Sequence, residues 1–208
     1  MTIDISQMPN VDKEEVFKYM RKIGWVESRV YWLINSRYRT YSELKTWIKF
    51  QLENPGPELK KVAAQMTFIK NEDKRMQEII RYWNVKLTYK ADDGEEWANA
   101  EDTIKTLKGD CEDGAALVFL TARLSGISEN RIFFVCGHVR DPNLRPVDVG
   151  HAYCVYIANN LKEYVADWTY YPVESIAMKV PYDRRNEYNY GKTEWFRFTD
   201  KDSFRKKQ

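Results

Sequence analysis

Three residues in the second half of the sequence could together attack an acyl group: a cysteine, a histidine and an aspartate. Cys111 comes directly before an apolar stretch that predicts a buried helix. At a helix start, the helix dipole and the unpaired backbone N–H groups favour thiolate over thiol. The same N–H groups can stabilise the oxyanion that forms when sulfur attacks an acyl carbon. Cys111 is therefore the candidate nucleophile, and an inert buried cysteine is the alternative.

A nucleophilic thiol needs a base, and the sequence holds only two histidines, His138 and His151. His151 begins a predicted strand, and Asp167 lies in the next predicted strand between apolar residues. A carboxylate in such a strand is costly to bury without a partner. An imidazolium is a suitable partner, and the contact fixes the tautomer for proton transfer. We therefore expect a catalytic triad of Cys111, His151 and Asp167.

The pairing of those two strands decides whether the triad can form. Asn159 and Asn160 mark the turn between them, because asparagine tolerates positive φ. A two-residue turn would place His151 opposite Trp168 and would send Asp167 to the other face. A three-residue loop ending at Asn160 would place His151 directly opposite Asp167. The chemistry thus requires an odd-length loop or a bulge, although an asparagine pair favours the tight two-residue turn.

Helices come first along the chain and strands follow. Apolar residues recur at helical period between residues 12 and 83, and Asn71 is a predicted N-cap. The stretch 112–124 is apolar on most sides, which predicts a buried helix ending at Gly126. The period then falls to two in four segments, which are 131–139, 151–157, 162–169 and 194–199. A buried helix followed by consecutive strands predicts an α+β fold, with the helix packed on an antiparallel sheet.

Several of these residues occur in motifs that resemble a known superfamily. The motifs are Trp97–Ile104, Lys108–Asp113, Gly150–Ala152 and Asp167. Together they resemble the transglutaminase-like superfamily, and within it the bacterial transglutaminase-like cysteine proteinases. The resemblance implies a papain-like core with a Cys-His-Asp triad, carried here by Cys111, His151 and Asp167. It also implies that Trp97 walls the substrate cleft.

The resemblance does not extend to the beginning of the chain. We expect an N-terminal helical extension over residues 1–70 and a transglutaminase-like cysteine hydrolase core over residues 71–208.

Three carboxylates, Asp110, Glu112 and Asp113, surround the candidate nucleophile. Their charge opposes thiolate formation. They have two interpretations: caps that suit the helix dipole, or ligands for a hard cation such as calcium, which would cancel their field. Because some relatives are calcium-dependent, the resemblance adds weight to calcium. The triad chemistry itself requires no cofactor.

A zinc site is a weaker alternative. Cys136, His138, His151 and Cys154 supply the ligand types of a tetrahedral zinc centre. Their spacing matches no common zinc framework, and His151 and Cys154 have opposite strand parity.

The composition, 43% hydrophobic and 31% charged residues, predicts a soluble globular protein. The net charge of +2 argues neither for nor against a nucleic-acid partner. The sequence contains no apolar run of about 18 residues, so we expect no membrane-spanning segment. The N-terminus lacks the regions of a secretory signal, and three cysteines form no regular disulfide framework, so we expect a cytoplasmic location.

Residues 17–50 carry eight basic residues against two acidic ones, with nine aromatic residues interleaved. Such a segment can bind a polyanion, or it can form amphipathic helices with solvated basic faces.

The sequence therefore predicts hydrolysis of an amide bond in a protein or peptide substrate, through a thioester acyl-enzyme. The alternatives are transglutaminase-type acyl transfer to an amine and a non-enzymatic binding module on the same fold.

Overall fold

The computed structural model describes residues 13–27, 41–91, 97–140, 148–169 and 193–206 of the chain. The helices are α1 (Lys13–Lys22), α2 (Tyr41–Glu53), α3 (Pro57–Met66), α4 (Glu72–Lys86), α5 (Ala100–Thr106) and α6 (Cys111–Leu124). The strands are β1 (Trp25–Glu27), β2 (Thr88–Tyr89), β3 (Lys108–Gly109), β4 (Ile132–Arg140), β5 (Asp148–Ile157), β6 (Glu163–Ala166), β7 (Thr193–Phe198) and β8 (Ser203–Lys206).

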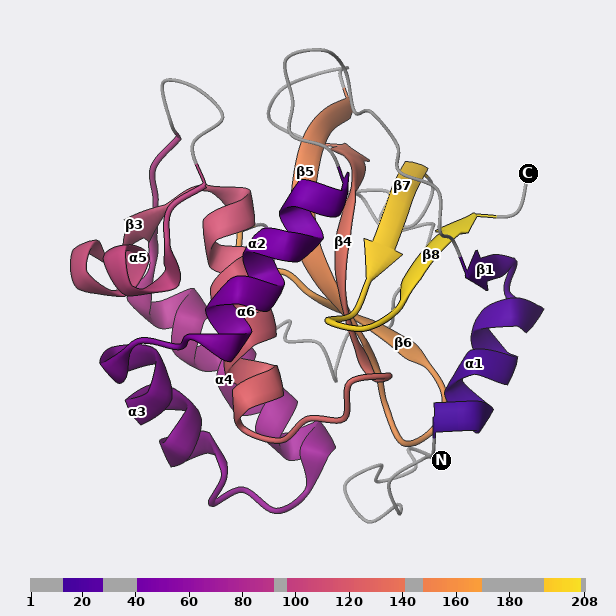
Figure 1. Cartoon of the computed structure of the whole chain (residues 1–208), viewed down its shortest axis with the longest axis horizontal. Helices are drawn as coiled ribbons and strands as arrows, with labels where there is room; N and C mark the ends of the chain where they lie inside the picture. The colour runs from indigo at the N-terminus through magenta and orange to yellow at the C-terminus, as the bar shows by residue number, and fades with distance from the viewer. Residues whose placement is uncertain (1–12, 28–40, 92–96, 141–147, 170–192, 207–208) are drawn as a thin grey trace.

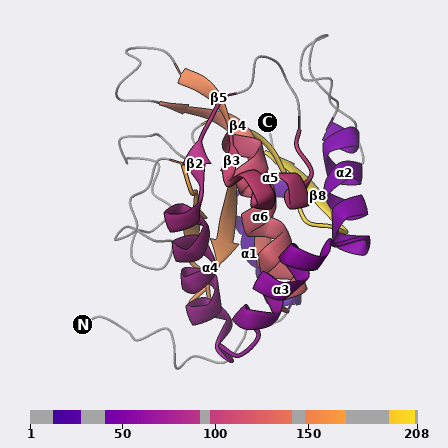
Figure 2. The same cartoon turned by 90° about the vertical axis from the view of Figure 1, so that its left-hand side faces the viewer.

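Six of the strands form one antiparallel sheet in the order β1-β8-β7-β4-β5-β6. Helix α6 lies on one face of this sheet with α2–α5 around it, and α1 lies on the other face (Figures 1 and 2). Strands β2 and β3 form a separate parallel pair that leads into α6. The predicted α+β fold, with a buried helix packed on an antiparallel sheet, is confirmed.

Helix α6 is the centre of the larger hydrophobic cluster. Its residues from Glu112 to Ala122 are all buried, as the apolar stretch predicts. Asp110 precedes the helix in an extended conformation, and Gly126 follows it with φ +89°, a conformation that glycine adopts without strain. The helix therefore begins at Cys111 and ends at Leu124, before Gly126.

The two faces of the sheet are visible in the alternation along β5. Even-numbered residues such as Ala152 and Cys154 join the cluster around α6, whereas Tyr153 and Val155 join the cluster on the α1 face. Period-two patterning therefore places His151 and Tyr153 on the same face, where their rings stack at 5.8 Å.

The hairpin between β5 and β6 has the predicted loop length but a different register. Ala158 donates to the Lys162 carbonyl at 3.0 Å, so three residues form the loop, and Leu161 adopts φ +57°. The loop starts one residue later than predicted, and Cys154 pairs with Ala166. His151 is therefore not directly opposite Asp167. The even shift keeps both residues on one face, and they meet diagonally instead.

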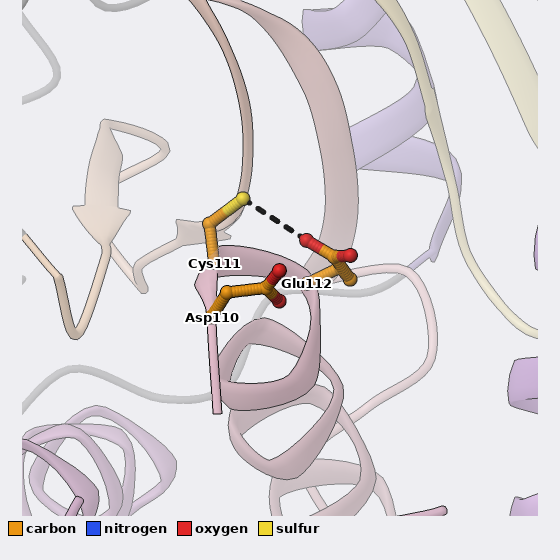
Figure 3. A group of neighbouring side chains, drawn as sticks. All are labelled: Asp110, Cys111 and Glu112. Atoms are coloured by element: carbon orange, nitrogen blue, oxygen red, sulfur yellow. Dashed lines mark hydrogen bonds between the residues drawn. The ribbon is translucent and has the colours of Figure 1, made fainter. Parts of the chain in front are cut away.

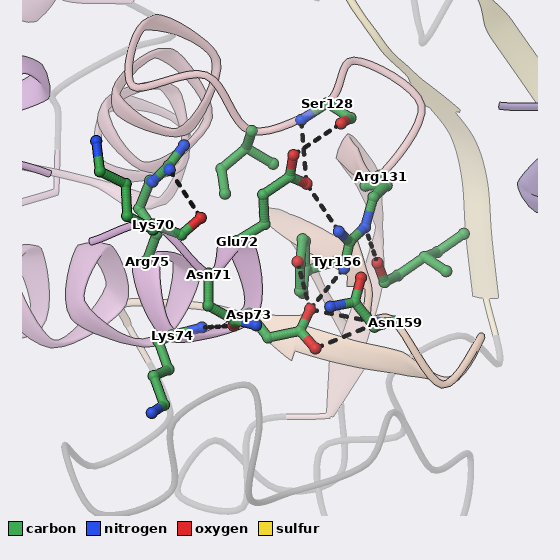
Figure 4. A network of polar contacts seen from close by, with 12 residues as sticks. Lys70, Asn71, Glu72, Asp73, Lys74, Arg75, Ser128, Arg131, Tyr156 and Asn159 are labelled. Carbon is green, nitrogen blue, oxygen red and sulfur yellow. Dashed lines mark hydrogen bonds and ion pairs between the residues drawn. The ribbon is translucent and has the colours of Figure 1, made fainter. Parts of the chain in front are cut away.

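A buried ion network holds this loop and the start of α4 together (Figure 4). Arg131 pairs with Glu72 at 2.8 Å and with Asp73 at 2.5 Å. Asp73 also accepts from the Tyr156 hydroxyl at 2.6 Å and from the Asn159 N–H at 3.3 Å. A side chain from α4 thus bonds the first residue of the hairpin loop, which fixes where the turn begins.

The N-cap prediction for α4 is also correct, since the Asn71 side chain accepts from the Lys74 N–H at 3.0 Å.

The N-terminal part of the chain contributes to both layers. Leu44, Ile48, Leu59 and Val62 of α2 and α3 belong to the cluster around α6. Strand β1 pairs with β8 as an edge of the sheet. The division into 1–70 and 71–208 stays a prediction, and the described residues of the first part pack as integral pieces of the fold.

Within the residues that the structure describes, no helix is long and apolar enough to cross a membrane. The cytoplasmic location stays a prediction.

The buried network makes a prediction about stability. We expect Arg131→Met to lower the free energy of unfolding by about 3–5 kcal/mol, because it leaves two buried carboxylates without their counter-charge. Urea denaturation at neutral pH measures the change. The matched control is Arg81→Ala, which breaks an exposed pair with Glu78 and costs at most about 1 kcal/mol. Equal losses for the two variants would show that the network does not stabilise the hairpin.

Candidate active site

The candidate nucleophile lies at the first turn of α6. Cys111 is partly exposed, and its thiol donates to Glu112 Oε2 at 3.1 Å (Figure 3). Burial raises the pKa of Cys111 well above its usual value, and the charge of Glu112 raises this pKa further. The expectation that the helix start favours the thiolate is therefore not met in this state. Burial and the neighbouring carboxylate both favour the protonated thiol.

One group opposes this effect, the backbone N–H of Ala152, whose hydrogen bond to the Cys111 sulfur lowers the pKa of the thiol. Its availability follows from the hydrogen bonds of β5. Ile157 donates to the Arg131 carbonyl, so odd-numbered residues bond to β4, and even-numbered residues such as Ala158 bond toward β6. Pairing with β6 ends at Cys154. The Ala152 N–H consequently points past the end of β6, where the sulfur meets it.

The candidate base and its partner are in direct contact. His151 Nε2 lies 2.7 Å from Asp167 Oδ2, and both side chains are almost completely buried. The other carboxylate oxygen of Asp167 accepts from the Thr169 N–H at 2.8 Å. An ionised carboxylate only accepts hydrogen bonds, so this contact assigns the proton between the two groups to Nε2 of His151.

Of the predicted triad, the structure shows the contact between Asp167 and His151 and a contact of Cys111 with the strand that carries His151, and the triad itself stays a prediction. Asp167 contacts His151 directly, and the Cys111 thiol contacts Ala152, the residue after His151 along β5.

The three predicted metal ligands separate into two groups. Ligand atoms of Asp110, Cys111 and Glu112 lie within 4.8 Å of one another. The pKa of Glu112 is raised by burial, and a hydrogen bond with Asp110 opposes this shift. Asp113 instead accepts from the Ala98 N–H at 2.9 Å, which ties the segment before α5 to α6. Two of the three carboxylates remain as candidate calcium ligands.

The zinc alternative has no geometric counterpart in the described part of the chain. The acidic group around Cys111 is the only set of three or more ligand residues that lies within 4.8 Å there. Cys136, His138, His151 and Cys154 are spread along β4 and β5 without forming such a set.

Trp97 is half-buried and belongs to an aromatic pair. Its ring lies 5.3 Å from that of Trp47 on α2. Beside this pair, Glu43, Thr46, Trp47 and Phe50 line an open groove of about 390 Å³. Trp97 thus contacts one residue of this groove, Trp47, and its own role as a cleft wall stays a prediction.

Residues 28–40 of the basic N-terminal segment lie outside the described residues. Within its described part, Lys45 donates to the Lys201 carbonyl at 2.7 Å, and Lys49 pairs with Glu53. Polyanion binding through residues 17–50 stays a prediction.

Sequence reasoning missed Trp168, which lies just after the end of β6. The Trp168 indole packs on α6 so closely that a Cβ on Gly114 would lie 1.9 Å from Trp168 Nε1. A glycine inside an apolar helix is a signal of close packing. The partner is far away in sequence, so the signal could not be interpreted before the fold was known.

No family model matches this sequence, and a search of curated proteins finds no match. Similar solved structures do exist. The EGTA-treated form of Legionella pneumophila LapG has a TM-score of 0.52 at 13% identity, covering 77% of this chain and 84% of LapG. A second LapG structure has a TM-score of 0.49 at 14% identity and covers 74% of this chain and 83% of that one. A calcium-bound LapG structure has a TM-score of 0.44 at 13% identity and covers 90% of this chain and 84% of that one.

The chain therefore has the fold of LapG, a transglutaminase-like cysteine protease. The family resemblance in the sequence is confirmed at the level of the fold.

The contact between Cys111 and Glu112 can be tested by alkylation. Glu112→Gln removes a negative charge beside the thiol, so the pKa of Cys111 falls and more thiolate is present at neutral pH. We expect faster reaction with iodoacetamide in the presence of a chelator, about tenfold for each unit by which the pKa falls. The control Asp102→Asn removes an exposed carboxylate on α5 and leaves the rate unchanged. An unchanged rate in Glu112→Gln would exclude charge control of the thiol.

Proposed function

We propose that the protein is a cysteine hydrolase that cleaves an amide bond in a protein or peptide substrate. The observation that carries this proposal is the buried 2.7 Å contact between His151 and Asp167. Next to it along β5, the backbone N–H of Ala152 donates a hydrogen bond to the Cys111 sulfur. A cysteine at a helix start, a histidine and an orienting carboxylate are the three groups that thiol-based acyl chemistry needs. The LapG-like fold supports the same kind of reaction.

The proposed reaction uses His151 twice. Nδ1 accepts the thiol proton of Cys111, and the sulfur adds to the substrate carbonyl carbon. The backbone N–H of Cys111, at the start of α6, would stabilise the oxyanion. Nδ1 then returns the proton to the leaving amine as the C–N bond breaks and a thioester remains. Water, deprotonated by His151, attacks the thioester, releases the acid and restores the thiol. Asp167 holds the imidazolium throughout.

Calcium is the cation that the first turn of α6 would hold. Asp110 and Glu112 supply hard oxygen donors that suit calcium, whereas the Cys111 sulfur is too soft to be a ligand. Bound calcium would supply positive charge that offsets the two carboxylates and favours the thiolate. Of the similar structures, one of LapG is calcium-bound.

A non-catalytic binding role is the second candidate, and one observation favours it. The raised pKa of Cys111 and its contact with Glu112 are properties of an unreactive thiol. Acyl transfer to an amine would use the same thioester as hydrolysis and differs only in the group that enters.

Catalysis can be tested by sequencing new protein N-termini in a lysate treated with the protein. We expect cleavage that Cys111→Ala abolishes and that Asp167→Asn slows by about 10²–10⁴-fold, because the amide favours the wrong tautomer of His151. Cys136→Ala, which removes a buried thiol from β4, keeps the activity within a few-fold.

Three outcomes distinguish the candidate functions. Cys111-dependent new N-termini support hydrolysis. Incorporation of an added primary amine into proteins without new N-termini indicates acyl transfer. If the wild type and Cys111→Ala give identical products, the protein does not act through Cys111, and the non-catalytic binding role is favoured.

The calcium proposal predicts a shift in melting temperature. At calcium concentrations about 100 times the Kd, binding adds about 2.7 kcal/mol, which raises Tm by about 5–11 °C for a chain of this size. Glu112→Gln and Asp110→Asn reduce this shift, whereas the control Asp102→Asn retains it. The same Tm with chelator and with millimolar calcium would leave helix capping as the role of these carboxylates.

A further inference from the structure

An exposed tyrosine lies one strand away from the segment that leads into Cys111. Strand β2 pairs in parallel with β3, so Tyr89 is the partner of Gly109, and the Lys90 N–H donates to the Gly109 carbonyl at 2.9 Å. Paired strands lie about 4.8 Å apart. Since Cys111 follows Gly109 by two residues at about 3.3 Å per residue, the backbones of Tyr89 and Cys111 lie on the order of 8 Å apart.

The ring of Tyr89 rests on a fixed base. It lies 6.1 Å from the Trp168 ring, tilted by 31°. Trp168 is buried against Gly114 on α6, and its carbonyl accepts from Asn84 at 2.7 Å. Tyr89 itself is 52% exposed. An aromatic side chain supported from below and open above offers contact area at little further cost in conformational entropy.

The position of this aromatic pair relative to the catalytic residues gives it a role. Trp168 directly follows Asp167, and Gly114 lies one helical turn after Cys111. Trp168 is therefore next to Asp167 along the chain and packs about one helical turn from Cys111, and Tyr89 is the exposed member of the pair.

We propose that Tyr89 determines substrate specificity by receiving an apolar or aromatic side chain of the substrate close to the scissile bond. The substrate residue packs on the exposed face of the ring while its neighbouring carbonyl is presented to Cys111. This inference rests on the proposed hydrolase function and adds the kind of side chain that the substrate carries.

The chain offers a matched control for Tyr89. Phe68 is 81% exposed and lies between α3 and α4. The 15 residues of α4 separate it from β2, a helix length of about 22 Å at 1.5 Å per residue. Phe68→Ala thus removes an exposed ring from a remote surface, whereas Tyr89→Phe keeps the ring in place.

The test uses dipeptidyl acyloxymethyl ketones with phenylalanine or glycine at either of the two positions before the ketone. The Cys111 thiolate displaces the carboxylate and forms a thioether, which intact mass measures as a second-order rate constant. Iodoacetamide, which has no side chain to bind, reports the reactivity of the thiol itself. All reactions are run on the full chain, with calcium and with chelator.

We expect the wild type to react faster with a phenylalanine probe than with the glycine probe. Tyr89→Ala reduces this preference about 3- to 10-fold, the range for losing one aromatic contact. Tyr89→Phe and Phe68→Ala keep the preference, and all variants react equally with iodoacetamide.

The opposite results are distinguishable. An unchanged preference in Tyr89→Ala, or no preference in the wild type, overturns the inference. A parallel loss of the iodoacetamide rate in Tyr89→Ala also overturns it, because Tyr89 then acts on the thiol and not on the substrate. If Cys111 reacts no faster than Cys136 and Cys154 with any reagent, the proposed hydrolase function fails, and the inference fails with it.

Discussion

The candidate site depends on the point where β6 stops pairing with β5. Beyond Ala166 the chain leaves the edge of β5, and the Trp168 indole packs between this chain and α6. The start of α6 can therefore reach the strand edge, and the Cys111 sulfur takes the Ala152 N–H that a longer β6 would have bonded. Asp167 has left the ladder but keeps its contact with His151 through the side chain. A sheet that paired to its end would have no room for the thiol.

The carboxylates in the first turn of α6 have two opposite effects: they stabilise the helix start, and they disfavour the thiolate of Cys111. Carboxylates at Asp110 and Glu112 suit the positive end of the helix dipole and stabilise the helix start. The same charges, together with burial, hold the proton on Cys111. The Ala152 N–H opposes them but does not outweigh them. A positive charge at these two carboxylates would serve the thiol without weakening the helix, which is why a cation is the natural complement of this arrangement.

The long elements of the fold could be predicted because their patterns are local. The apolar run of α6 and the alternation in β4, β5 and β7 depend only on neighbouring residues. Strands β1, β2 and β3 contain two or three residues each, too few for any period, and exist because distant partners pair with them. The β5–β6 loop starts one residue later than the sequence predicts, because Asp73 on α4 accepts a hydrogen bond from the Asn159 N–H. No local pattern contains that contact.

The candidate site also has features that the sequence predicts and features that depend on the fold. Residue type and motif point to Cys111, His151 and Asp167, because few groups can perform this chemistry. The protonation of the thiol depends on burial and on the orientation of Glu112, which arise only after folding. Trp97 could be identified from the family resemblance. Trp168 and Tyr89 could not, because the interest of each depends on a tertiary neighbour: Gly114 for Trp168 and Gly109 for Tyr89.

The edge of the sheet formed by β1 and β8 has a consequence for how the protein is made. Trp25 pairs with Lys206, so the partners lie at opposite ends of the described chain. At synthesis rates of about 5–20 residues per second, Trp25 waits on the order of 10 s before its partner leaves the ribosome. Throughout that time the apolar residues of α1, Val16 and Met20, have no completed sheet to cover. The nascent chain must therefore tolerate an exposed hydrophobic surface on α1 until β8 has been synthesised.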